Sequence, residues 1–575
     1  MCGFLWTLVI LGVTTMPWSN FVGHAHWQRV HWIPFAETSL HWWFILDFFG
    51  NIVLFLPFGG CGVLSMPHRS GRRRVLRAAG YAALLSLSVE FFQVYCHNRS
   101  PAMTDVCTNV TGALLGAWFI VRPPTVVSRL LRGRVWGCCW LLLLLGGGSA
   151  SADQPPNIVM IYADDLGWSD VGFNGRTEWQ TPHLDRLAQQ GMVFDRWYSA
   201  AAVCAPSRAA FLTGKYPIHN GVTGNLDDLP DTQVTIAEAL KSYGYVTGLF
   251  GKWHRGCESS PMYGFTHPMD QGFDEFFGFT DARHAWEQFP KELWVGREHQ
   301  PVSGYANTLF TDRSIDFISR HHQQPFFLYV PYIATHFYIQ APEDDVAEYR
   351  GKFAEKDPRQ PFNAIYAAMV TRMDKEIGRI LQTLESFNLT RRTLVVFSSD
   401  QGATFEQENE GASAYHSSNR PFRGQKRTLW EGGIRVPAVV RWPGKIPAGR
   451  RSSVVTSMID LMPTFLAAAS LRPQRRWKVD GRNMLPVWQG KRAAPERILF
   501  WEWRGDGSTQ LAAMLGKFKL IVTEQNPPEL FDVEADPGEQ RSVIAEHKTL
   551  AVQLQHALDT WLRTEILKPP CRERQ

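Results

Sequence analysis

The sequence predicts an α/β protein in which an N-terminal all-α membrane bundle precedes a doubly wound domain. Apolar segments crowd the first 150 residues, whereas from Asn157 onward short apolar strands alternate with helical stretches. This alternation is typical of a sheet with helices on both faces. The chain has 575 residues, of which 45% are hydrophobic and 20% are charged, so at least two folded units are expected.

Five apolar segments in this first part are candidates for membrane spans. They cover residues 3–17, 43–66, 75–96, 105–121 and 135–145. A spanning helix needs about 20 residues, so the second and third segments are adequate and the first and fourth are marginal. The fifth is short, follows basic residues and leads into Ala150-Ser151-Ala152, as a signal peptide does. Cleavage of this segment and its retention as an anchor both stay open.

Arginine residues beside these segments predict the topology. Residues 67–74 form a short loop with four arginines, and four more lie within residues 122–134. Basic loops stay in the cytoplasm, so five crossings deliver residue 153 onward to the other side. We therefore expect a multi-pass membrane protein, with lipid as a partner, in which the part from residue 153 onward lies on the extracytoplasmic side. That side is the periplasm in a bacterium.

Polar residues at helical spacing interrupt the apolar segments. The pairs are Asp47 and Asn51, Glu90 and Gln93, and Asp105 and Asn109. A carboxylate buried in a bilayer is costly, so these groups either serve a function or fix the bundle by bonding to one another. Gly112-x-x-x-Gly116 follows the last pair and permits close helix contact.

Three stretches of this region, 50–59, 88–93 and 105–116, resemble the VanZ-like membrane family. The resemblance extends over about residues 40–121. It implies a small helical bundle, and it informs the topology more than the chemistry.

The composition argues against two classes of function. The net charge is +5 and no run of Lys and Arg alternates with aromatic residues, so we expect no nucleic-acid partner. Six of the nine cysteines fall in the first 139 residues, and no Cys-x-x-Cys pair occurs. Neither a disulfide framework nor a zinc site is therefore predicted.

Four strand-like runs in the second part end in residues that are able to do chemistry. Residues 158–162 precede Asp164 and Asp165, 245–250 precede Lys252 and His254, 326–332 precede His336, and 394–397 precede Asp400 and Gln401. In open α/β sheets, ligands bind at the carboxyl ends of strands. Each residue alone would more often be a cap, a turn or a structural residue. Together they predict one site that contains acids, a lysine and two histidines.

Residues 202–214 predict a helix that begins near Cys204. Pro206 suits the first helical turn, and Gly214 suits the end. Cys204 would then lie at a helix N-terminus, where free N–H groups favour an anion, with Arg208 one turn further on. Cys204 is either a buried free cysteine or a thiolate nucleophile activated by the helix end. A phosphatase loop would require a longer spacing between the cysteine and the arginine.

The motif Cys204-x-Pro206-x-Arg208, followed by Ala-Ala-Phe-Leu-Thr-Gly, resembles the sulfatase family's signature for enzymatic oxidation of the cysteine to formylglycine. The resemblance covers about residues 155–540, with further motifs in the family's order. These are Asn157-Ile-Val-x-Ile-x-Ala-Asp164-Asp165, Gly251-Lys252-Trp-His254, Thr335-His336, Ser399-Asp400-Gln401-Gly402, Arg423-Gly-x-Lys426 and Glu431-Gly-Gly-Ile-Arg435. Residues 529–539 resemble the family's small C-terminal sheet.

The resemblance implies a site for one divalent cation, calcium or alternatively magnesium. The ligands would be Asp164, Asp165, Asp400, Gln401 and residue 204. Carboxylate and amide oxygens are the hard ligands that calcium prefers. Gln401 stands where many family members have asparagine, and its longer amide can still reach a cation.

The resemblance also implies roles for the remaining residues. Formylglycine derived from Cys204 would be the nucleophile, and Arg208 would hold its hydrate. Lys252 and Lys426 would bind sulfate oxygens. His336 would protonate the departing alcohol, and His254 would be the base that releases sulfate. The domains would be 1–123 (VanZ-like), 124–152 (basic linker and fifth apolar segment), 153–475 (catalytic) and 476–575 (C-terminal α+β subdomain).

The predicted activity is the release of inorganic sulfate from a sulfated small molecule or glycan, with a sulfated carbohydrate favoured. A formylglycine-generating or sulfatase-maturing enzyme would be a partner. Two alternatives are a phosphodiesterase or phosphonate hydrolase of the same superfamily, and a non-catalytic membrane protein that binds sulfated glycans. A Trp-and-basic stretch either lines a sugar subsite or is a solvated loop. Its residues are Arg283, His284, Trp286, Lys291, Trp294 and Arg297.

Overall fold

The computed structural model describes residues 7, 10, 42–66, 71–93, 103–121, 155–254, 266–281, 284–505, 507–524 and 526–564. The chain divides into two compact units, Met1–Ala152 and Asp153–Gln575. Each unit is considered by itself.

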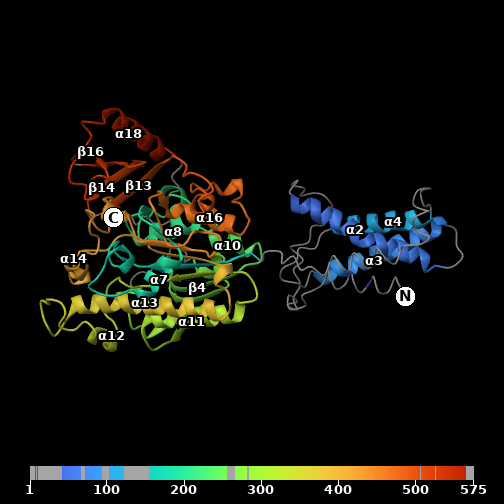
Figure 1. The fold of residues 1–575 in the computed structure, drawn as a ribbon, viewed down its shortest axis with the longest axis horizontal. Helices are drawn as coiled ribbons and strands as arrows, with labels where there is room; N and C mark the ends of the chain where they lie inside the picture. The colour runs from blue at the N-terminus through green and yellow to red at the C-terminus, as the bar shows by residue number, and fades with distance from the viewer. Residues whose placement is uncertain are drawn as a thin grey trace. The chain divides into compact units, whose positions relative to one another are not determined.

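Three helices form most of the described part of the N-terminal unit (Figure 1). They are α2 (Trp42–Leu64), α3 (Gly71–Gln93) and α4 (Met103–Val121). A Cβ on Gly112 would collide with the carbonyl oxygen of Ile52, and one on Gly116 would collide with that of Leu56. The two glycines thus let α4 approach the backbone of α2, as their spacing predicts.

Polar side chains also join these helices. Asn51 Nδ2 donates to Asp105 Oδ1 (3.2 Å), and Asn109 Nδ2 donates to Ser86 Oγ (2.9 Å). For these residues the structure favours a role in fixing the bundle.

No helix in the described part of the chain is both long enough and apolar enough to cross a membrane. The crossings predicted over 43–66, 75–96 and 105–121 are therefore not confirmed. Residues 135–145, and nearly all of 3–17, lie outside the described residues.

A ten-stranded mixed sheet forms the centre of the second unit, with the order β11-β2-β10-β9-β1-β8-β4-β5-β6-β7. The strands are β1 (Asn157–Ala163), β2 (Met192–Phe194), β4 (Val246–Lys252), β5 (Glu275–Phe279), β6 (Glu292–Val295), β7 (Glu298–Pro301), β8 (Phe326–Pro331), β9 (Thr393–Ser399), β10 (Ala438–Arg441) and β11 (Arg450–Ser452). Strands β9, β1, β8, β4 and β5 are parallel, whereas β10, β6 and β7 pair antiparallel to their neighbours. The α/β class is as predicted, but the antiparallel strands make the sheet mixed.

Alternate residues of β1 face two different cores. Ile158 and Met160 pack with α8, α10 and α16, whereas Val159 and Ile161 pack with α7, α11 and α13. The helices are α7 (Pro182–Gln190), α8 (Cys204–Thr213), α10 (Ile236–Lys241), α11 (Ala306–His321), α13 (Phe362–Ser386) and α16 (Leu461–Ala468). Both faces of the sheet are therefore covered (Figure 1).

A side chain from another helix caps the N-terminus of α7. Asp374 of α13 accepts hydrogen bonds from the backbone N–H groups of His183 (3.1 Å) and Leu184 (2.7 Å). Burial raises the pKa of Asp374 to about 7.

The C-terminal region is a four-stranded antiparallel sheet with one helix. It comprises β13 (Ile498–Gly505), β14 (Ser508–Leu515), β15 (Phe518–Thr523), β16 (Asn526–Asp532) and α18 (Lys548–Leu562). One face of this sheet packs with α18. On the other face, Trp501 and Met514 cluster with Tyr198 and Val203, and Trp501 Nε1 donates to Ser199 O (2.7 Å). This sheet therefore contacts the segment that leads into Cys204.

Candidate active site

The carboxyl ends of neighbouring parallel strands bring the predicted site residues together. Strand β1 lies between β8 and β9, and Ala163 is paired with Ser399, so Asp164 and Asp400 follow at the same level. Asp164 N donates to Ala334 O (2.9 Å), which fixes the start of the loop that carries His336. The sheet topology thus places residues that are far apart in sequence on one edge.

Acidic and amide groups surround the cysteine in this cluster. Cys204 Sγ lies 3.6 Å from Asp164 Oδ1 and 4.0 Å from Asp165 Oδ1. Gln401 Nε2 is hydrogen-bonded to Asp165 Oδ1 and lies 3.3 Å from Cys204 Sγ. Potential ligand atoms of Asp164, Asp165, Cys204 and His336 all lie within 4.8 Å of one another.

Cys204 is the first residue of α8, as the sequence predicts. Its helix ends at Gly214, which has φ 67° in the left-handed region. The backbone N–H of Ala205 donates to Asn225 Oδ1 (3.1 Å), so a side chain absent from the sequence prediction satisfies part of the helix start. Burial raises the pKa of the Cys204 thiol to about 12. A thiolate nucleophile is therefore disfavoured.

Three cationic side chains balance the three carboxylates. Arg208 donates to Asp400 Oδ2 through Nε (3.1 Å) and Nη2 (2.7 Å), and its Nη1 donates to Lys252 O (3.0 Å). Lys252 Nζ lies 2.6 Å from Asp164 Oδ2, and Lys426 Nζ lies 2.9 Å from Asp165 Oδ2. All of these side chains are buried.

The three carboxyl groups differ in their affinity for protons. Burial alone would raise the pKa of Asp164, but the charges of Lys252 and Arg208 hold it well below the usual range. Burial, together with the negative charge of Asp164, raises the pKa of Asp400 to about 8. Close packing of the three carboxyl groups therefore makes ionisation of Asp400 unfavourable. Additional positive charge would relieve this penalty.

The donor set fits a hard divalent cation. Three carboxyl groups and one amide converge, and these are the oxygen ligands that calcium and magnesium select. Gln401 Oε1 is buried and accepts no hydrogen bond from the residues that the structure describes. A half-turn of the amide would exchange its oxygen and nitrogen, and would direct this oxygen towards Asp165 and Cys204. A cation there would give Oε1 a partner.

The two predicted histidines differ in how they meet the cluster. His336 Nδ1 is bonded to Phe337 O (2.9 Å), and Nε2 lies 3.8 Å from Asp165 Oδ2. Burial and the charges of Lys252 and Lys426 hold the pKa of His336 well below 6.5. His254 is buried two residues beyond the end of β4 and has φ 52°. Its predicted role rests on that position.

Several supporting residues were not identified from the sequence. Thr335 Oγ1 donates to Asp165 O (3.1 Å), and Gln288 Nε2 donates to His336 O (3.0 Å). Within the Trp-and-basic stretch, Trp286 packs on Phe337 (ring centroids 5.1 Å apart), which in turn packs on His336. Arg297 instead pairs with Asp270 at 2.6 Å, and Arg283 lies outside the described residues. Trp286 therefore contacts the site through Phe337, whereas Arg297 is engaged in an ion pair.

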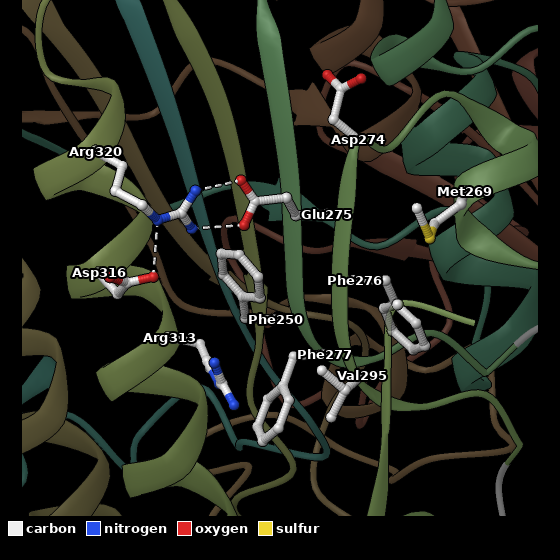
Figure 2. A pocket seen from close by; sticks show the side chains of 11 residues that line it. Phe250, Met269, Asp274, Glu275, Phe276, Phe277, Val295, Arg313, Asp316 and Arg320 are labelled. Atoms are coloured by element: carbon white, nitrogen blue, oxygen red, sulfur yellow. Dashed lines mark hydrogen bonds and ion pairs between the residues drawn. The ribbon is translucent and has the colours of Figure 1, made fainter. Parts of the chain in front are cut away.

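A separate pocket of about 170 Å³ lies against β4, β5 and α11 (Figure 2). The guanidinium group of Arg320, which lines this pocket, faces Glu275 (2.6 Å) and Asp316 (2.9 Å). Glu275 is paired with Gly248, four residues before Lys252 at the site edge. None of the predicted site residues lines this pocket.

Three family models match the chain: Sulfatase at residues 156–471, VanZ/LLP1 at 3–126, and N-sulphoglucosamine sulphohydrolase, C-terminal, at 423–565. The chain therefore belongs to the sulfatase family, with a VanZ-like N-terminal region, and is a sulfuric ester hydrolase.

Individual relatives agree with this assignment. N-acetylgalactosamine-6-sulfatase of Mus musculus is 35% identical over an alignment of 436 residues, with coverage of 69% of this chain and 78% of the relative. Steryl-sulfatase of Mus musculus is 30% identical over 529 residues, with coverage of 72% and 82%. The crystal structure of Ps i-CgsB in complex with k-i-k-neocarrahexaose is 30% identical, with a TM-score of 0.65 and coverage of 72% and 94%.

Proposed function

We propose that this sulfatase uses formylglycine at position 204 and one divalent cation, calcium or alternatively magnesium, to hydrolyse a sulfated carbohydrate. The observation that carries the proposal is the position of the buried Cys204 among acids, an amide and cations, where burial raises the pKa of its thiol. A thiol held neutral is a poor nucleophile, whereas an aldehyde hydrate supplies one hydroxyl for attack on sulfur and a second for expulsion of sulfate.

The proposed cation ligands are Asp164, Asp165, Asp400 and Gln401, with residue 204 as a further contact. When bound, the cation would neutralise charge on the transferring sulfuryl group. The short distances among Asp164, Asp165 and Cys204 and the contact of Gln401 with Asp165 support the assignment. Asp400 follows β9 at the level of Asp164. Arg208 would hold both Asp400 and the modified residue 204, since it lies one turn along α8 and already bonds to Asp400.

Lys252 and Lys426 are the proposed sulfate ligands. Each now forms an ion pair with an aspartate of the cluster, at 2.6 and 2.9 Å. With Asp164 and Asp165 holding a cation, the two ammonium groups would be available to sulfate oxygens. Their positive charge would also stabilise the transition state.

His336 is the proposed acid for the departing alcohol, and His254 is the proposed base. The Nδ1 contact of His336 with Phe337 O directs Nε2 into the site. Its low pKa leaves the imidazole neutral, so we infer that it gains its proton when the anionic substrate offsets the nearby lysines. His254 lies at the end of β4, two residues from Lys252, where it could accept a proton from the modified residue.

The sulfated-carbohydrate assignment is supported by the names of two relatives, N-acetylgalactosamine-6-sulfatase and the complex with k-i-k-neocarrahexaose, whereas steryl-sulfatase points to steroids. A formylglycine-generating or sulfatase-maturing enzyme would be the obligatory partner. We also propose the domain boundaries 1–123, 124–152, 153–475 and 476–575, with lipid contacting the VanZ-like domain and the catalytic domain on the extracytoplasmic side.

Peptide mass spectrometry across residues 197–208 of active protein tests the modification directly. We expect the fraction of molecules with formylglycine at position 204 to be proportional to the specific activity of the preparation. Cys204→Ala should fold and be inactive. The matched control, Cys61→Ala, removes a cysteine of the other unit and should keep full activity. Intact cysteine throughout a fully active preparation would falsify the proposed nucleophile.

A further inference from the structure

We propose that Lys519 of the C-terminal sheet is a positioning residue, which holds the loop carrying Lys426 against the catalytic cluster. The inference rests on the proposed role of Lys426 in binding sulfate. Lys519 lies on β15 and is fully buried. Its ammonium group contacts Glu431 Oε1 (2.7 Å), Glu539 Oε1 (2.7 Å) and the backbone oxygen of Leu429 (3.1 Å).

Glu431 connects the ammonium group of Lys519 to the catalytic region. Its other carboxylate oxygen accepts from Tyr198 Oη (2.8 Å) and Arg435 Nη1 (3.1 Å), and its backbone N–H donates to Glu539 Oε2 (2.7 Å). Two carboxylates, Glu431 and Glu539, are thus balanced by Lys519 and Arg435. Removing Lys519 would leave the buried group with an excess negative charge.

The loop that carries Lys426 lies between this charge cluster and the metal-ligand segment. Lys426 N donates to Ala403 O (3.2 Å), and Arg427 N donates to Ala202 O (2.9 Å). Leu429 N donates to Gln510 Oε1 of β14 (3.0 Å). Two side chains of the C-terminal sheet therefore hold the backbone at Leu429, three residues from Lys426.

The same segment supports Gln401. Gly402 N donates to Gly433 O (3.0 Å), and a Cβ on Gly402 would collide with the carbonyl oxygen of Gly432. Glu431 immediately precedes these glycines in α15 (Glu431–Ile434). A shift of Glu431 would therefore move both Lys426 and the backbone that follows Gln401.

The test compares steady-state kinetics of full-length variants on 4-nitrophenyl sulfate, after formylglycine content has been equalised. Lys519→Met should raise KM at least tenfold, because displacement of Lys426 weakens sulfate binding. Simple destabilisation lowers the active fraction and hence the maximal rate, but leaves KM unchanged. Lys519→Arg should restore much of the affinity.

Two further variants keep the test decisive. Gln510→Ala removes the second, half-buried contact to Leu429 and should raise KM even if Lys519→Met fails to fold. Arg497→Met breaks another buried ion pair, with Asp460, and should lower stability without raising KM.

Lys426→Met distinguishes the sulfate-binding role of Lys426 from the positioning role of Lys519. An unchanged KM in Lys426→Met would overturn the proposed role of Lys426 itself. A raised KM in Lys426→Met, together with unchanged KM values in Gln510→Ala and in any folded Lys519→Met protein, would overturn the positioning role of Lys519.

Discussion

Lys252 and Asp164 form a fully buried ion pair, with 2.6 Å between Nζ and Oδ2. Lys426 pairs in the same way with Asp165 (2.9 Å). Each lysine thus neutralises a carboxylate that is proposed to hold the cation. Binding of the cation and of sulfate would exchange these partners together, so the two ligands should bind cooperatively.

This coupling predicts that inorganic sulfate binds more tightly in the presence of calcium. A coupling of about 1–3 kcal/mol corresponds to roughly a 5–150-fold change in affinity. The dissociation constant of sulfate, measured by calorimetry with and without added calcium, gives the factor directly. Equal affinities would contradict the partner exchange. Lys252→Met should weaken sulfate binding and reduce the factor.

Removal of the divalent cation should abolish turnover and lower the melting temperature. Without added positive charge, three buried carboxyl groups repel one another, as the raised pKa of Asp400 indicates. Asp165→Asn should lose the response of the melting temperature to calcium, whereas the exposed Asp344→Asn should retain it. Thermal unfolding after chelation and dialysis, with calcium or magnesium restored, measures both effects. Full activity in a strong chelator would remove the cation from the mechanism.

His336→Gln should affect substrates according to their leaving groups. A sugar alkoxide is a poor leaving group and must be protonated as it departs, whereas 4-nitrophenolate departs readily without protonation. General acid catalysis contributes roughly 10²–10⁴-fold, so kcat should fall by about that factor on a sulfated sugar and far less on 4-nitrophenyl sulfate. An equal loss on both substrates would assign His336 to another role.

Asp374 should make stability depend on pH. Its pKa rises from 3.8 in the unfolded chain to about 7 in the folded one, so between these values the folded chain binds more protons. The free energy of unfolding should therefore decrease as pH rises from about 4 to about 7, by up to a few kcal/mol at about 1.4 kcal/mol per pKa unit. Denaturant titrations of the wild type and of Asp374→Asn at a series of pH values test this. The same dependence of the free energy of unfolding on pH in both proteins would refute it.

Reporter fusions test the proposed topology. A reporter that is active only after export should work when it is fused after residue 160, and should be silent when it is fused at residue 70. A cytoplasmic reporter should give the reverse pattern. Cytoplasmic activity of the fusion at 160 would overturn the extracytoplasmic placement.

Much of the site could be predicted because one local rule applies to each strand. A strand followed by a polar residue is visible in the sequence, and parallel neighbours then bring Asp164, Lys252, His336 and Asp400 to one edge. The helix that begins at Cys204 is likewise a local signal, carried by Pro206 and Gly214.

The remaining contacts depend on residues that are distant in sequence. Antiparallel pairing of β10 with β9 follows from how the chain returns to the sheet, and no local periodicity encodes it. Asn225 and Gln288 are ordinary polar residues until folding brings them to Ala205 N and His336 O. The burial of Lys519 by two glutamates is equally invisible, because an isolated lysine in a strand usually faces solvent.

All ten residues of α8 are buried in the folded unit. If Cys204 is oxidised by a separate enzyme, that enzyme must reach the segment while it is still extended. Folding then ends the period in which the modification is possible, and a molecule that folds first keeps its thiol. One preparation would contain two populations with the same fold, one modified and one not. Its specific activity would depend on the relative rates of folding and oxidation during biosynthesis.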